Sequence, residues 1–377
     1  MKKSYYLFGA LCLVAVVWLY VAVRNNDASE DRSVKIGAAL GLTGECANYG
    51  EGELKAIKLA VAEANKDGGI KGRPIELVVE DTECDAKSSV TAMKKLIEVD
   101  KVEAVIGPTW GDSFQAGFTV SNSRKVVTIS PSTALEALVY NEMPTDYVFS
   151  TWFPEKIEVD TLQAHAQKIG AKNFVIIHDT DTYGAMLADL FARYAPQHEI
   201  TIVKEFTLPV GTEDFRTTLV QAKSLAVDGI ALFFQAPSSK AKVLKQMREL
   251  GLKTQVVTDA SIEDMSLLAN FGFAMEGLLY TYPELTGAVD EFSRKFKEEY
   301  GTDSIGASDA NAYDATRATI TALDERYTKD VELVDAVRYV NIPGTAVSRV
   351  LFDDAHQITE AKFVVKTVRD GEFIVVE

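Results

Sequence analysis

The first unit that the hydrophobic pattern predicts is a strand, a helix and a second strand. A short apolar run over residues 34–40, bounded by turn residues, predicts a buried strand. The apolar side chains that follow recur on one helical stripe, at Leu54, Ile57, Val61 and Ala64. Residues 75–81 predict the second strand, so the unit is a parallel, right-handed crossover with a helix on the sheet. Ligands of such sheets bind beyond the carboxyl ends of the strands, which places the polar loop 43–50 beside a ligand.

The same alternation of strands and helices continues along the chain to about residue 282. Further strands are predicted at 102–107, 126–130, 174–178, 200–206, 229–234 and 255–258. Amphipathic segments separate them, such as the stripe of Leu244, Met247 and Leu250. This order predicts an α/β fold with a mostly parallel sheet.

The N-terminus differs from the rest of the chain. Lys2 and Lys3 precede nineteen uncharged residues, Tyr5 to Val23, which as a helix would span about 28 Å. The alternatives are a cleaved signal peptide and a retained transmembrane anchor. No clean Ala-x-Ala site follows the apolar run, which favours the anchor, with residues 24–33 as a tether and the remainder outside the cytoplasm.

The net charge and the cysteines bear on the class of ligand and on the compartment. The formal net charge is −16, which argues against nucleic-acid binding because that needs a basic footprint. Cys46 and Cys84 follow the first and second strands, at the same edge of the sheet. If those strands are neighbours, the two loops can bring the cysteines within disulfide distance, and an oxidising compartment permits the bond. Two free thiols are the alternative.

Several short motifs in this first unit carry a resemblance to a known family. They are Thr43-Gly44 with Tyr49-Gly50, the turn from Gly68 to Gly72, and Glu80-Asp81 with Cys84-Asp85. Together they resemble the start of a type I periplasmic binding protein of the leucine/isoleucine/valine-binding kind, and the likeness extends over about 34–377. Relatives that carry a disulfide here pair the position of Cys84 with that of Trp110, so a Cys46–Cys84 bond would be a departure.

The resemblance implies two Rossmann-like lobes joined by a three-strand hinge, here preceded by the N-terminal transmembrane helix. The crossings are expected near 150–154, 280–283 and 344–349. Lobe 1 would then hold 34–151 and 283–346, and lobe 2 would hold 152–282 and 347–377. Residues 1–33 would form a cytoplasmic stub, a membrane anchor or signal peptide, and a tether.

A cleft between such lobes can hold the two charges of a free amino acid. Helix starts supply backbone donors for its carboxylate. Two segments qualify, Gly111 to Ser113 and Ser132-Thr133, and family members hold the ligand carboxylate with these segments. Ordinary helix caps are the alternative for both.

For the ammonium group the resemblance favours Asp259, at the end of the strand 255–258, with Tyr183 beside it. The alternative for Asp259 is a cap of the next helix. Tyr49 and Trp110 are expected at the side-chain end of the pocket, or else pack at its rim. No arginine or lysine is evident there, which favours a neutral side chain.

Catalytic and cofactor sites are not predicted. The histidines, His165, His178, His198 and His356, show no metal-ligand spacing, and no dinucleotide, P-loop or nucleophile-elbow motif is present. The sequence therefore predicts an extracytoplasmic solute-binding protein, with no cofactor and no metal, that delivers a small amino acid or related carboxylate to an ABC permease. A membrane-tethered sensor that signals to a partner protein is the alternative, and an enzyme is the least supported class.

Overall fold

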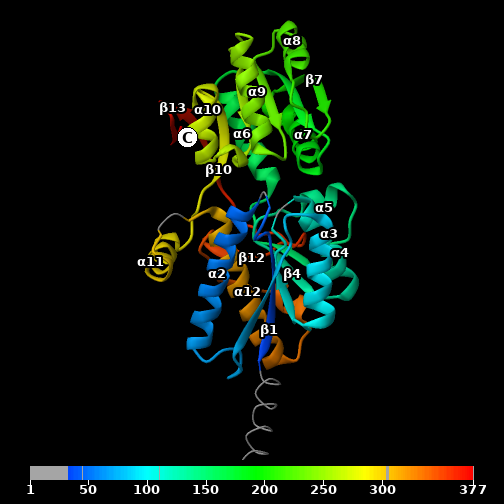
Figure 1. The fold of residues 1–377 in the computed structure, drawn as a ribbon, viewed down its shortest axis with the longest axis vertical. Coiled ribbons are helices and arrows are strands. Elements are labelled where there is room, and N and C mark those ends of the chain that lie inside the picture. The colour runs from blue at the N-terminus through cyan, green and yellow to red at the C-terminus, as the bar shows by residue number, and fades with distance from the viewer. Residues whose placement is uncertain (1–32, 45, 110, 303–304, 377) are drawn as a thin grey trace, which may run out of the picture.

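The molecule consists of two lobes joined end to end, each built on its own sheet (Figure 1). The computed structural model describes residues 33–44, 46–109, 111–302 and 305–376. We call the half that holds strands β1 to β5 lobe 1, and the half that holds β6 to β10 with β13 and β14 lobe 2. The predicted two-lobe α/β architecture is confirmed.

Lobe 1 is organised around a five-stranded parallel sheet in the order β2-β1-β3-β4-β5. Its strands are β1 (Val34–Leu40), β2 (Ile75–Asp81), β3 (Ala104–Ile106), β4 (Val127–Ser130) and β5 (Val148–Ser150). Its long helices are α2 (Ala47–Lys66), α3 (Ala86–Lys94), α4 (Gly111–Arg124) and α12 (Ala307–Lys329). The side chains of β1 pack into two different hydrophobic clusters, one on each face of the sheet. Ile36 belongs to the cluster with α2 and α12, and Ala39 belongs to the cluster with α3. The sheet is therefore buried on both faces, as the mostly apolar run of β1 predicts.

Smaller elements complete lobe 1. They are the π-helical turn η1 (Lys95–Val99), α5 (Glu136–Tyr140), α11 (Val289–Tyr300), α13 (Leu333–Arg338) and the antiparallel pair β11 (Asn341–Pro343) and β12 (Arg349–Leu351).

Lobe 2 is organised around a seven-stranded sheet in the order β14-β13-β10-β9-β8-β6-β7. Its strands are β6 (Asn173–Asp179), β7 (Thr201–Leu208), β8 (Gly229–Phe233), β9 (Gln255–Thr258), β10 (Leu279–Pro283), β13 (Phe363–Arg369) and β14 (Glu372–Val375). Strands β6 to β10 are parallel, and β13 and β14 are added antiparallel. Phe174 and Ile176 pack on one face of this sheet, whereas Val175 and Ile177 pack on the other.

The helices of lobe 2 cover both faces of its sheet (Figure 1). They are α6 (Glu155–Lys168), α7 (Thr182–Tyr194), α8 (Arg216–Ser224), α9 (Pro237–Glu249) and α10 (Met265–Met275), with the 3-10 turns η2 (Ala195–His198) and η3 (Ala260–Ile262). Asp181 caps α7 by accepting the Tyr183 N–H, and Asp259 caps η3 by accepting the Ser261 N–H.

The chain passes between the lobes three times. The first crossing joins β5 to α6 over 151–154, and the second follows β10, close to the predicted places. The third lies between β12 and β13, later than the predicted 344–349. Phe352 and Ile358 still pack in the core of lobe 1, which keeps the chain in that lobe until the loop before Phe363.

The predicted transmembrane segment and tether lie outside the described residues. Within the described ranges, no helix combines the length and the apolar character needed to cross a membrane.

Candidate functional site

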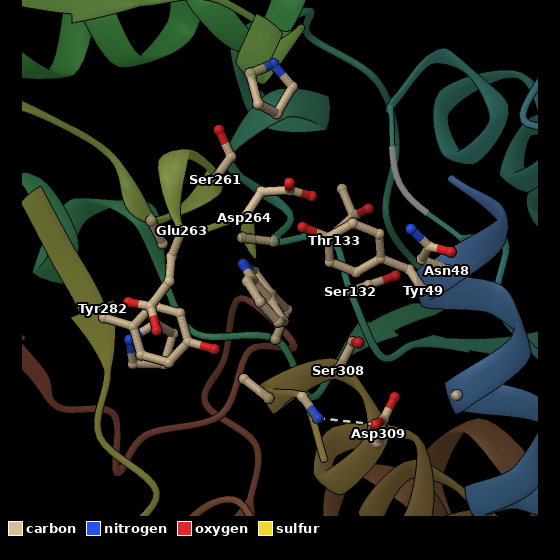
Figure 2. A pocket seen from close by; sticks show the side chains of 18 of the residues that line it. Asn48, Tyr49, Ser132, Thr133, Ser261, Glu263, Asp264, Tyr282, Ser308 and Asp309 are labelled. Carbon is tan, nitrogen blue, oxygen red and sulfur yellow. Dashed lines mark hydrogen bonds between the residues drawn. The ribbon is translucent and has the colours of Figure 1, made fainter. Parts of the chain in front are cut away.

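A cavity of about 530 Å³ lies between the lobes and is lined from both (Figure 2). This volume falls within the roughly 300–1,000 Å³ of small-molecule sites. Lobe 1 contributes the start of α2, the loop after β4 and the start of α12, and lobe 2 contributes the carboxyl ends of its parallel strands. The cavity therefore occupies the place that the sheet topology predicts for a ligand.

The loop after β4 presents two hydroxyl groups to the cavity. Ser132 and Thr133 line it. The Thr133 hydroxyl has no hydrogen-bond partner among the described residues, and the Ser132 hydroxyl lies beside the carboxyl group of Glu53. The loop itself is held by two neighbours, since the Thr133 N–H donates to Ser130 Oγ at 3.1 Å and the Thr133 carbonyl accepts from Ser150 Oγ at 2.8 Å. Two fixed hydroxyl donors, of which that of Thr133 is unpaired, suit an anionic oxygen pair.

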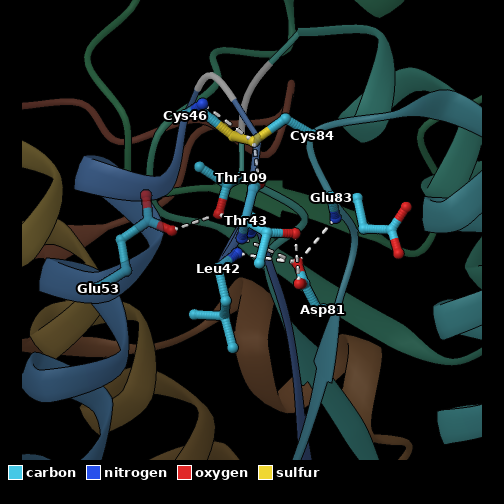
Figure 3. Close-up of a disulfide and its surroundings, with 9 residues drawn as sticks. Leu42, Thr43, Cys46, Glu53, Asp81, Glu83, Cys84 and Thr109 are labelled. Carbon is cyan, nitrogen blue, oxygen red and sulfur yellow. Dashed lines mark hydrogen bonds between the residues drawn. A yellow bond between two sulfur atoms is a disulfide. The ribbon is translucent and has the colours of Figure 1, made fainter.

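A second fixed element is the loop that leads into α2 (Figure 3). Cys46 and Cys84 are joined by a disulfide, with their Cα atoms 5.9 Å apart. Nearby, Asp81 accepts hydrogen bonds from the Leu42 N–H at 3.0 Å and the Thr43 hydroxyl at 2.7 Å. These ties fix the start of α2, whose next turn carries Asn48 and Tyr49 into the cavity wall.

Glu53 stands behind this wall, fully buried on α2. Its Oε2 accepts the Thr109 hydroxyl at 2.7 Å, and its Oε1 has no partner among the described residues. Burial raises the pKa of Glu53 to about 7, because the hydrogen bonds from Ser132 and Thr109 compensate only part of the lost hydration.

Two carboxyl groups enter the cavity at the start of α6. Glu155 is 4% exposed, lines the cavity, and its Oε2 has no partner among the described residues. Glu158 is 2% exposed, and its Oε1 accepts the Ala260 N–H and the Thr281 hydroxyl, both at 2.8 Å. Burial and the neighbouring Glu158 raise the pKa of Glu155 well above its ordinary value, and burial also raises that of Glu158.

Asp259 lies behind the surface that lobe 2 presents to the cavity. It is 1% exposed, and its Oδ2 lies 2.5 Å from Nζ of Lys240, which is itself fully buried. Tyr183 lines the cavity and donates to Asp259 Oδ1 at 3.4 Å. Burial and the negative charge of Asp259 raise the pKa of Tyr183 well above its ordinary value, so Tyr183 keeps its hydroxyl proton.

The described lining residues are strongly acidic, with seven carboxyl side chains and one lysine. Several of the seven already have a structural task. Glu263 pairs with Lys366 at 2.6 Å, and Asp264 caps α10. Asp309 at the start of α12 accepts the Gly306 N–H at 2.8 Å, and burial raises its pKa to about 6.

The structure brings together only some of the residues predicted from sequence. Tyr49, Ser132, Thr133 and Tyr183 line the cavity. Ser113 and Asp259 are buried but are absent from the described lining, although Ser113 Oγ also lacks a partner among the described residues. Gly111 is the first residue of α4.

Trp110 lies outside the described residues.

Sequence reasoning missed Glu155, Glu158 and Gln235, which also line the cavity. A signal existed for each. Gln235 stands just past the end of a predicted strand, where ligands of parallel sheets bind. Glu155 and Glu158 are three positions apart on one helix face, directly after the predicted first crossing.

Comparison with known proteins gives a consistent result. A family model described as periplasmic binding protein matches residues 33–372. The Leu/Ile/Val-binding protein of Escherichia coli is 26% identical over 265 residues, which cover 70% of this chain and 71% of that protein. The leucine-, isoleucine-, valine-, threonine- and alanine-binding protein of Pseudomonas aeruginosa is 23% identical over 346 residues, 88% of this chain and 89% of that protein.

Solved structures share the fold. A leucine binding protein from Thermotoga maritima superposes with a TM-score of 0.79 at 23% identity, covering 91% of this chain and 98% of that one. A branched-chain amino acid binding protein from Streptococcus pneumoniae, in complex with isoleucine, gives 0.76 at 22% identity, covering 91% and 99%. A solute binding protein from R. palustris, in complex with benzoate, gives 0.75 at 20% identity, covering 91% and 95%.

Proposed function

This chain belongs to the periplasmic binding protein family, of the leucine/isoleucine/valine-binding kind, and we propose that it captures a small amino acid between its lobes and delivers it to an ABC importer. Its relatives are binding proteins and not enzymes. The proposed place of action is outside the cytoplasm, as the family name and the relatives suggest.

The observation that carries the proposal is the unpaired hydroxyl of Thr133, which lies beside the Ser132 hydroxyl in the cavity wall. A buried donor without a partner costs free energy, so the loop is arranged for an acceptor that arrives from outside. Isoleucine and benzoate, found in two structures of the same fold, share a carboxylate and little else. A ligand carboxylate on these hydroxyls therefore agrees with the chemistry of both.

Lobe closure completes the proposed binding. A charge-assisted hydrogen bond contributes about 1.5–3 kcal/mol, and micromolar affinity requires about −8 kcal/mol. A few such bonds from two lobes reach that value once closure excludes water from the cavity. The three crossings between the lobes are the natural hinge for this motion.

Attachment to the membrane forms a finer part of the proposal, supported by sequence alone. Residues 5–23 are uncharged and follow Lys2 and Lys3. The mass of the mature N-terminus distinguishes a retained segment from a cleaved one.

Thermal-shift and calorimetric titration of the purified chain with leucine, isoleucine, valine, threonine and alanine test the main proposal. A ligand at 100 times its Kd is expected to stabilise the protein by about 2.7 kcal/mol. Thr133→Val keeps the side-chain shape and removes one hydroxyl, so it is expected to weaken binding roughly 10- to 100-fold.

The matched control is Thr91→Val on the exposed surface of α3, where the hydroxyl bonds only the Lys87 carbonyl. This control is expected to bind like the unmodified protein. No shift with any amino acid of the panel, or full affinity in Thr133→Val, would contradict the proposal.

A further inference from the structure

We propose that the ammonium group of the ligand binds to the carboxylate of Glu155, with Gln235 as a second acceptor, and not to Asp259. This inference rests on the proposed function and adds the cationic half of the ligand to it. It follows from three features of lobe 2: a carboxylate whose acceptor sites are mostly filled, a buried carboxylate with a free oxygen, and an amide oxygen in the wall of the same cavity.

Asp259 has little acceptor capacity left for a ligand. Its Oδ2 accepts from Lys240 Nζ at 2.5 Å, while the nearby Thr258 hydroxyl donates its one proton to the Leu232 carbonyl at 2.7 Å. Its Oδ1 accepts from the Ser261 N–H at 3.0 Å and from the Tyr183 hydroxyl at 3.4 Å. An ionised carboxylate offers about four lone-pair positions, and these three donors fill most of them. The buried lysine also neutralises its charge, so an ammonium group gains little there.

Glu155 is in the opposite situation. Its Oε2 is buried in the cavity wall and has no partner among the described residues. The adjacent Glu158 is anchored by the Ala260 N–H and the Thr281 hydroxyl and is also hydrogen-bonded to the carboxyl group of Glu155, so Oε2 of Glu155 is the oxygen of the pair that remains available. Glu155 is also the first residue of α6, where the positive end of the helix dipole favours an anion.

The protein supplies no cation for this carboxylate from among the described lining residues. Lys55 is the one basic side chain in that set, and it comes from α2 of lobe 1, where it lowers the pKa of Asp309 against the effect of burial. A buried carboxylate without a cation keeps a proton instead, and burial together with Glu158 raises the pKa of Glu155 accordingly. An arriving ammonium group can take the place of that proton.

Strand order places Gln235 at the same rim of the cavity. Strands β9, β8 and β6 are neighbours, and Tyr183 after β6 reaches Asp259 after β9. Gln235 follows β8, between these two, and its Oε1 is buried without a partner among the described residues. The Tyr183 hydroxyl still has an acceptor lone pair, so three acceptors on one rim match the three N–H groups of an ammonium ion.

Calorimetry with two probes of the same carbon skeleton tests the proposal on the full chain. L-Leucine carries the ammonium group, and 4-methylpentanoate lacks it. The unmodified protein is expected to bind leucine the more tightly. Glu155→Gln resembles the protonated acid in shape and hydrogen bonding, so folding is expected to persist. It should weaken leucine binding at least about 10-fold and leave 4-methylpentanoate unchanged or improved.

Two further variants sharpen the result. Gln235→Met removes the second acceptor and is expected to weaken leucine binding alone, which keeps the proposal testable if Glu155→Gln folds poorly. Glu372→Gln is the matched control, because Glu372 is exposed on β14 of the same lobe, outside the described cavity lining, and the charge change is identical. Its affinity for each of the two probes is expected to stay within about 2-fold of that of the unmodified protein.

The outcomes separate this inference from the function on which it rests. Full leucine affinity in Glu155→Gln overturns the inference and leaves the proposed function intact. An equal loss for leucine and 4-methylpentanoate also overturns it, because the defect would then not concern the ammonium group. Failure of the unmodified protein to bind any amino acid of the panel overturns both.

Discussion

Replacing Lys240 by methionine is expected to destabilise lobe 2 strongly. Lys240 is on α9 and Asp259 follows β9, and their side chains are 0% and 1% exposed. Methionine keeps most of the volume and removes the charge, which leaves Asp259 buried without its cation. Removing one partner of a buried pair costs about 3–5 kcal/mol. For a unit of 150–250 residues this lowers the melting temperature by roughly 6–20 °C.

A control on the same helix isolates the effect of burial. Lys242 pairs with Glu213 at 2.6 Å, almost the distance of the buried pair, but the two side chains are 34% and 70% exposed. Exposed pairs contribute about 0–1 kcal/mol, so Lys242→Met is expected to have little effect.

The double variant Lys240→Met/Asp259→Asn tests the pairing itself. Asparagine retains the cap on η3 and carries no charge, so the double variant is expected to be less destabilised than the sum of its two single variants. Hydrogen exchange in β8 and β9 is the preferred measurement, because two lobes need not unfold together. The reasoning would be refuted if Lys240→Met lowered the free energy of unfolding by less than about 1 kcal/mol, or if the effects of the two single variants simply added up in the double variant.

Two further predictions concern lobe 1. Reduction of the Cys46–Cys84 bond, which closes a loop with a sequence separation of 38, is expected to lower stability by about 4 kcal/mol in urea unfolding, whereas a Cys46→Ser/Cys84→Ser variant should not respond to reductant. Burial raises the pKa of Glu53 from 4.5 to about 7, so the folded state holds a proton that the unfolded chain has lost, and stability falls as pH rises through that window. Glu53→Gln, which cannot ionise, is therefore expected to gain about 3 kcal/mol relative to the unmodified protein between pH 4.5 and 7.5, and a constant difference would contradict this account.

The fold could be predicted in some detail because its signals are local. The predicted strands 34–40, 75–81 and 255–258 match β1, β2 and β9, since short apolar runs between turn residues have few other solutions in an α/β chain. The third crossing was placed too early because its position depends on where Phe352 and Ile358 pack, and packing across a lobe is not a local property of the sequence.

The site was harder to predict because it depends on partners that are distant in the chain. Asp259 was correctly expected at a strand end. Its ion-pair partner, Lys240, lies 19 residues earlier on a helix, where a lysine usually faces solvent. Ser132 and Thr133 could be placed at the rim because they directly follow a strand. What their hydroxyls bond to, and whether any partner remains, is visible only once the lobes are assembled.

Glu155 shows why residue type alone does not locate a binding group in so acidic a chain. Among 55 acidic residues, two carboxylates three positions apart carry no information by themselves. The first crossing, however, places Glu155 at the opening turn of α6, inside the space between the lobes. A carboxylate on the outer surface is hydrated, whereas one in a cavity must be neutralised by a proton, a protein cation or a ligand. Asp259 has Lys240, and Glu155 has no such partner among the described lining residues, so a cation from solution is the group that would complete the cavity.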